Sequence, residues 1–151
     1  MPLARSGPRR KADVLEKLEA HGADTWVATA SAAGSAHLVP LSYSWDGRLV
    51  TLAVLPDSPT FRNVETSRKA RLGFGPTRDV ALIDVELEAS LAVSEADEET
   101  ASAYAEQSDW DPRAEGGDYR FLRLRPTRIQ AWREANELAG KLLMRDGAWL
   151  F

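Results

Sequence analysis

Residues 36–63 read AHLVPLSYSWDGRLVTLAVLPDSPTFRN, and this stretch decides the fold that we expect. Every second residue from Val39 to Trp45 is apolar or aromatic, which is the period of two typical of a half-buried β-strand. Asp46-Gly47 supplies a residue pair that tolerates positive φ in a two-residue turn, and residues 48–54 return as a second strand. The stretch therefore predicts a tight β-hairpin.

A helix is expected to start at the end of the same stretch. Ser58 is a capping residue, and Pro59 suits the first helical position, where its missing N–H would have no partner. The first turn of such a helix can hold an anion such as a phosphate. The groups available for it are the free N–H groups, the hydroxyls of Ser58 and Thr60, and the side chains of Arg62 and Asn63. An ordinary capped surface helix explains the same residues.

The composition limits the class of protein. A chain of 151 residues is long enough for one domain with its own core. It contains no cysteine and two histidines, which excludes disulfides, thiolate metal sites and a histidine-rich metal site, so we expect no metal and a cytoplasmic location. No segment approaches the ~18 apolar residues of a membrane span. The net charge of −4 argues against nucleic-acid binding.

The rest of the chain predicts one domain over residues 9–151, with a C-terminal extension, behind a disordered tip over residues 1–8. Helices are expected over 9–20, 59–67 and, after a capping box of Ser94 and Asp97, up to Gln107. Further strands are expected over 26–30, 70–75, 83–91 and 119–133, the last interrupted at Pro126, with a small hairpin around Asp146-Gly147. The strands 26–30, 36–45 and 48–54 should form an antiparallel meander. The pattern predicts a mainly β fold with α additions, a small antiparallel barrel of about six strands.

Single polar residues add little to this interpretation. His37 begins a strand, where a histidine is more often a hydrogen-bonding residue than an acid or base. Pro40 cannot donate to a ladder, which indicates an edge, a bulge or a backbone held open toward a ligand. Asp84, Glu86 and Glu88 share one face of an amphipathic strand, and we interpret them as solvated residues.

Apolar residues late in the chain indicate a homodimer. Trp110 stands alone in a polar loop, Trp132 ends a strand, and the chain finishes on Trp149-Leu150-Phe151. A barrel of this size can hardly bury all of them, so we expect them to cover a pocket or to pack against a partner subunit.

The order of these pieces resembles the FMN-binding split-barrel superfamily, which includes pyridoxamine 5′-phosphate oxidase-like proteins and their F420-dependent relatives. The resemblance covers residues 12–132. It depends on the N-terminal helix, the strand with HLVPLSYSW, the DG hairpin, the DSPTFRN turn into a helix, and the GPTRDV turn before the alternating strand.

The resemblance implies a six-stranded antiparallel split β-barrel that dimerises and binds F420 or FMN at the subunit interface. It implies that the cofactor-binding residues are His37, Val39, Pro40, Leu41, Ser58, Thr60, Arg62, Asn63 and Arg78. The implied activity is hydride transfer to an unknown small-molecule substrate, which explains why no catalytic dyad or triad is visible; the alternative is a non-catalytic carrier of the cofactor.

Between the two cofactors the sequence favours F420 narrowly. F420 carries a polyglutamate tail beyond its phosphate, and a basic rim of Arg68, Lys69, Arg71 and Arg78 would attract it. Many F420-binding relatives have a lysine where this chain has Thr60, so we expect weak, salt-sensitive binding.

Overall fold

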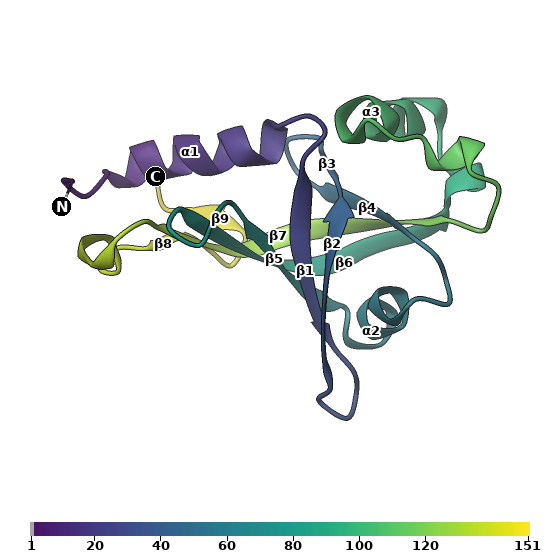
Figure 1. Ribbon diagram of the computed structural model, residues 1–151, viewed down its shortest axis with the longest axis horizontal. Helices are drawn as coiled ribbons and strands as arrows, with labels where there is room; N and C mark the ends of the chain where they lie inside the picture. Colours follow the sequence, from purple (N-terminus) through teal and green to yellow (C-terminus); the bar gives the residue numbers. More distant parts are fainter. Residues whose placement is uncertain (1) are drawn as a thin grey trace.

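The computed structural model describes residues 2–151 as one curled sheet with three α-helices (Figure 1). The helices are α1 (Gly7–Glu19), α2 (Pro59–Ser67) and α3 (Glu98–Ser108). The strands are β1 (Asp24–Ala30), β2 (Ala36–Ser42), β3 (Ser44–Trp45), β4 (Val50–Val54), β5 (Lys69–Phe74), β6 (Val80–Ala92), β7 (Arg120–Trp132), β8 (Leu142–Arg145) and β9 (Ala148–Trp149). In Figure 1, α1 and α3 lie along one side of the sheet and α2 lies on the other. Among the described residues no helix is long and apolar enough to cross a membrane.

The strands form an antiparallel split barrel, as the sequence predicted. Their order is β2-β1-β5-β6-β7-β4-β3, with the β8–β9 hairpin attached to β7. The two end strands, β2 and β3, are joined through the single residue Tyr43, so the sheet curls until its ends meet. Nine strands replace the expected six because β2 and β3 are separate and the C-terminal hairpin joins the sheet.

The predicted meander is confirmed only in part, because the strand expected over residues 36–45 divides at Tyr43 and its first part, β2, does not pair with β4. β2 pairs with β1, and β4 pairs with β3 and β7. Tyr43 explains the break in the strand. Its ring is buried in the main core, and its hydroxyl donates a hydrogen bond to the carbonyl of Lys17 at the end of α1. Burial raises the pKa of this phenol to about 12, so Tyr43 stays neutral at this seam.

The loop of the β3–β4 hairpin has four residues and not the two that we predicted. β3 ends at Trp45 and β4 begins at Val50. The Asp46 carboxylate accepts hydrogen bonds from the backbone N–H groups of Arg48 (2.8 Å) and Leu49 (2.6 Å), which favours a wider turn. Gly47 has the positive φ (94°) that the Asp-Gly pair indicated.

The long strands β6 and β7 form the back of the barrel. Pro126 does not interrupt β7 as we had predicted, because a bulge accommodates it. Val85 pairs with Pro126 and Asp84 with Arg128, which leaves Thr127 as the extra residue. The Thr127 hydroxyl donates to the Asp84 carbonyl at 3.2 Å, so this acceptor keeps a partner at the bulge.

The N-terminal segment is ordered, which corrects the expectation of a disordered tip over residues 1–8; Met1 lies outside the described residues. Ser6 caps α1, so the helix begins at Gly7 and not at Arg9. The side chain of Arg5 is 8% exposed and forms ion pairs with Glu137 (2.7 Å) and Asp13 (2.8 Å).

The C-terminal residues Trp149 and Phe151 contact α1 of their own chain, although the side chains of Leu150 and Phe151 are 44% and 49% exposed. Lys11 of α1 lies over the Trp149 ring at 4.8 Å, and its amine donates to the Phe151 carbonyl at 2.8 Å. The ends of the chain therefore lie together beside α1 (Figure 1). Trp132 lies under Lys141, with 5.0 Å between the amine and the ring.

A second, smaller core lies under α3 and contains Trp110. Trp110 packs edge-on against Tyr104 and Tyr119, with ring centroids 6.3 and 5.1 Å away. The helix is capped by Asp97, which accepts from the Thr100 N–H at 2.7 Å, and not by Ser94 as predicted. Ser94 lies in a separate 3₁₀ turn, because the preceding residue Val93 is buried in this core.

Candidate cofactor-binding cavity

A cavity of about 470 Å³ lies in the gap between β2 and β4. The two strands face each other across the split without a hydrogen-bonded ladder. One edge of β2 is unpaired there, and so is the second half of β4, because β3 pairs only with Val50 and Thr51. The lining residues are His37, Val39, Pro40, Leu41, Ala53, Val54, Leu55, Ser58, Pro59, Thr60 and Tyr119. Six of them were predicted from the sequence as cofactor-binding residues: His37, Val39, Pro40, Leu41, Ser58 and Thr60.

One wall of the cavity is β2. This strand has a single partner, β1, so Pro40 lies on an edge strand, one of the places the sequence allowed for it. His37 pairs across the ladder with Thr29 and makes no hydrogen bond through its ring within residues 2–151. Its imidazole is therefore available to a ligand.

The floor of the cavity is the start of α2. Ser58 caps the helix by accepting from the N–H of Phe61 at 3.2 Å, and Pro59 has no N–H to offer. The N–H and hydroxyl of Thr60 then remain without a partner in the described part of the chain, although Thr60 is only 2% exposed. Two donors at a helix N-terminus, facing a cavity, suit a phosphate oxygen.

Arg62 and Asn63 do not line the cavity, which corrects the prediction for both. The Arg62 guanidinium turns back and donates to the carbonyl of Asp57, in the loop before the helix. The Asn63 amide donates to the Thr29 hydroxyl at 3.0 Å and ties α2 to β1.

Arg78 does not line the cavity either. It lies in the turn after β5, and the six residues of this strand rise roughly 20 Å away from the end of α2. There Arg78 pairs with Glu134 at 3.2 Å, beside the end of β7.

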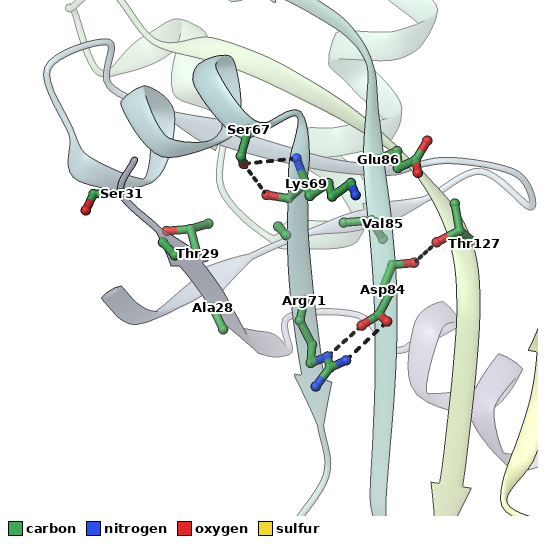
Figure 2. A pocket seen from close by; sticks show the side chains of 12 residues that line it. Ala28, Thr29, Ser31, Ser67, Lys69, Arg71, Asp84, Val85, Glu86 and Thr127 are labelled. Atoms are coloured by element: carbon green, nitrogen blue, oxygen red, sulfur yellow. Dashed lines mark hydrogen bonds and ion pairs between the residues drawn. The ribbon is translucent and has the colours of Figure 1, made fainter. Parts of the chain in front are cut away.

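The predicted basic rim is not at the cavity. Figure 2 shows Lys69 and Arg71 lining a different groove, of about 590 Å³, on the outer face of β1, β5 and β6. Arg71 points at Asp84 and pairs with it at 2.5 Å, so its charge is already neutralised (Figure 2). The cavity itself is lined by no lysine, arginine, aspartate or glutamate of the described chain.

Sequence reasoning missed the wall opposite β2. Ala53, Val54 and Leu55 lie at the end of β4, and Leu55 is 38% exposed, an apolar residue left on the surface after a strand. Tyr119 comes from the loop before β7, and no local signal in the sequence connects it with residues 37–60.

These features define a split β-barrel protein with an apolar ligand slot that ends at a helix N-terminus. The family model described as pyridoxamine 5′-phosphate oxidase matches residues 15–133, which include the whole lining of the cavity. The chain belongs to this family.

Solved structures show the same fold at low sequence identity. An F420 reductase superimposes with a TM-score of 0.63 at 15% identity, covering 76% of this chain and 94% of the other. General stress protein 26 of Bacillus anthracis gives 0.59 at 11% identity, covering 81% and 92%. HutZ, a heme storage protein of Vibrio cholerae, gives 0.58 at 14% identity, covering 82% and 92%. No curated protein matches the sequence.

Proposed function

We propose that the cavity between β2 and β4 binds a flavin-type cofactor and that the protein is an oxidoreductase acting on a small molecule. The observation that carries this proposal is the pair of donors on Thr60, which have no partner among the described residues and lie at the end of an apolar slot. A planar ring with a phosphate side chain would match this site, with the ring in the apolar slot and the phosphate at the two donors of Thr60. Such a cofactor, when bound, supplies hydride transfer.

The residues of this chain would bind the cofactor and exclude water. The side chains of Val39, Leu41 and Leu55 offer apolar contact to a ring, and the free edges of β2 and β4 offer backbone donors and acceptors to its polar rim. Thr60 and Ser58 meet the phosphate at the start of α2.

FMN fits this site better than F420, in contrast to our preference from the sequence. That preference depended on a basic rim for the polyglutamate tail. Arg71 and Arg78 are paired with carboxylates, and Lys69 lies in the groove of Figure 2. An uncharged cavity with two donors suits one phosphate group rather than a polyanion.

A non-catalytic carrier of the same cofactor is the alternative. The lining offers no charged side chain among the described residues, so nothing in it stabilises charge that develops on a substrate. The presence of a heme storage protein among proteins of this fold also shows that the fold serves storage.

The test is a titration of the purified protein with FMN and F420, followed by fluorescence and absorbance. We expect Thr60→Val to weaken FMN binding about tenfold or more, because hydrogen bonds to a charged group contribute about 1.5–3 kcal/mol. Thr66→Val is the matched control, since Thr66 is an exposed residue of the same helix. Equal affinities of the Thr60 variant and wild type would place the phosphate elsewhere.

The same samples separate the alternatives. Reduction of bound FMN by a nicotinamide donor, followed by reoxidation with an acceptor, supports an oxidoreductase, and flavin that no donor reduces supports a carrier. Tighter binding of F420 contradicts the preference for FMN. A Soret band after addition of heme, without binding of either flavin, contradicts the proposal as a whole.

We also propose that the protein is a homodimer, on different grounds from those in the sequence. Trp110, Trp132 and Trp149 contact residues of their own chain, whereas Leu150 and Phe151 are 44% and 49% exposed. The outer face of β1 and β2 instead exposes Trp26 (51%) and Leu38 (61%) around a hollow that Leu82 also lines. An exposed apolar hollow of this kind can be covered by the same face of a second copy related by a two-fold axis.

Sedimentation tests this dimer. Trp26→Asp should give a monomer at micromolar concentration. Leu3→Asp is the control, because Leu3 is 95% exposed but lies outside this face. A wild-type monomer, or a dimer that persists in the Trp26 variant, contradicts the proposed interface.

A further inference from the structure

A second cleft of about 410 Å³ adjoins the cofactor-binding cavity. It is lined by Pro56, Ala92, Val93, Ser94, Pro112, Arg113, Gly117, Asp118, Tyr119 and Arg120. Tyr119 lines both spaces, and Pro56 follows Leu55, which lines the cavity. The cleft and the cavity are therefore neighbours that share Tyr119 as a lining residue.

One arginine of the cleft is already neutralised. Arg113 pairs with Asp111 at 2.9 Å and with Glu98 at 3.1 Å, on the loop that follows α3. Its charge is used to hold this loop and the helix together. Arg113 therefore adds little attraction for a ligand.

Arg120 is different, because no carboxylate lies within ion-pair distance of it in residues 2–151. Its guanidinium is half-buried at the start of β7 and contacts only the Ser90 hydroxyl, at 3.2 and 3.4 Å. On its other side lies the Phe61 ring of α2, 5.7 Å from the guanidinium carbon. A partly desolvated cation without a counter-ion attracts an anion more strongly than an exposed one does.

The remaining lining residues indicate the kind of anion. Pro56, Pro112 and Tyr119 offer apolar contact to the body of a ligand, beside the Arg120 guanidinium. Asp118 is exposed, and its negative charge opposes a second negative charge on the ligand. The cleft therefore favours a small monoanion with an apolar body over a polyanion.

We propose that this cleft binds a small organic carboxylate, with Arg120 as the residue that recognises the carboxylate group. Because the cleft lies beside the cofactor-binding cavity, we take this carboxylate to be the substrate of the oxidoreductase, and this step rests on the proposed function. The binding itself does not depend on a cofactor.

Trp110 provides a built-in reporter for the cleft. Its ring packs on Tyr119, which lines the cleft, with 5.1 Å between the centroids. The indole N–H donates to Glu115 at 2.9 Å and gives one of five tryptophan indole signals in a nitrogen-proton NMR spectrum. The variant Trp110→Phe assigns that signal.

The experiment is an NMR titration of cofactor-free, full-length protein with benzoate and with its neutral isostere benzamide. We expect benzoate to shift the Trp110 signal while the other four indole signals stay in place, and benzamide to bind about tenfold more weakly or not at all. Arg120→Gln should weaken benzoate binding by about tenfold or more, because it removes a charge-assisted pair of hydrogen bonds. Arg128→Gln is the matched control, an exposed arginine of the same strand.

Equal binding of benzoate and benzamide by wild type would overturn the proposal without any variant. Unchanged benzoate binding by Arg120→Gln would also overturn it. If that variant is unfolded, Arg120→Lys, which keeps the charge and loses the planar fork, should bind benzoate more weakly than wild type and more tightly than benzamide. The FMN titration of the preceding subsection is a separate measurement, so failure of the cofactor proposal and failure of this one are distinguishable.

Discussion

Replacing Glu137 by glutamine should reveal how the N-terminal segment is held. The Glu137 carboxylate is buried and accepts hydrogen bonds from four N–H groups: the backbone and guanidinium of Arg5 at 2.7, 3.0 and 2.7 Å, and the backbone of Arg133 at 2.8 Å. The hydrogen bond from the Arg5 side chain is the main cause that lowers the pKa of Glu137 from 4.5 to about 2.

The pKa of the folded state lies below that of the unfolded state, so ionised Glu137 stabilises the fold above pH 4.5, and this stability is lost as the pH falls toward 2. A shift from 4.5 to about 2 corresponds to about 3 kcal/mol at neutral pH. At pH 3 the Glu137 carboxyl is protonated in the unfolded state and still mostly ionised in the folded state. The same linkage then leaves roughly 1–2 kcal/mol.

Urea unfolding at pH 7 and pH 3 measures these contributions. Glu137→Gln should lower the free energy of unfolding by about 3 kcal/mol at pH 7 and by roughly half of that at pH 3. Glu134→Gln is the matched control, because Glu134 pairs with Arg78, whose side chain is 79% exposed, and such surface pairs contribute about 0–1 kcal/mol. The reasoning is refuted if the cost of Glu137→Gln is the same at both pH values, or if the control variant costs as much.

Three further outcomes are expected. Arg62→Ala should leave the dissociation constant for FMN within about twofold of wild type in the fluorescence titration, because the guanidinium is turned toward Asp57 and the lost interaction is an exposed one. Tyr43→Phe should lower the free energy of unfolding by about 1 kcal/mol in urea, through loss of one buried hydrogen bond at the barrel seam, and a cost near zero would argue against that bond. Gly75→Ala should lower the melting temperature, since φ is +80° and a Cβ would lie 2.3 Å from the Asp79 carbonyl oxygen; an unchanged melting temperature would argue against this turn geometry.

Local structure was predictable from the sequence where a few neighbouring residues determine it. Ser58-Pro59 predicted the start of α2, and the alternating run over residues 83–91 predicted the buried and solvated faces of β6. The six cavity residues from β2 and the start of α2 were named mainly through the resemblance to the family, and their binding of a cofactor stays a prediction.

The features that we did not predict depend on how parts of the chain meet in space, and no short sequence pattern contains that information. The pairing of β2 with β1 but not with β4 is set by how the sheet curls around Tyr43. The position of Arg78 is set by the length of β5, and the direction of the Arg62 side chain by one backbone carbonyl. Tyr119 reaches the cavity only because β7 pairs with β4, a contact between residues about 70 positions apart.

The split between β2 and β4 also bears on how the protein avoids aggregation. Two strand edges without partners are templates on which a strand from another molecule can add, and a closed barrel would have no such edges. A proline in an edge strand is accommodated with its nitrogen away from the ladder, so Pro40 withholds a donor from any strand that approaches the free side of β2. Pro40 therefore makes the free side of β2 a poorer site for fibre growth, while the gap beside it stays open to a ligand.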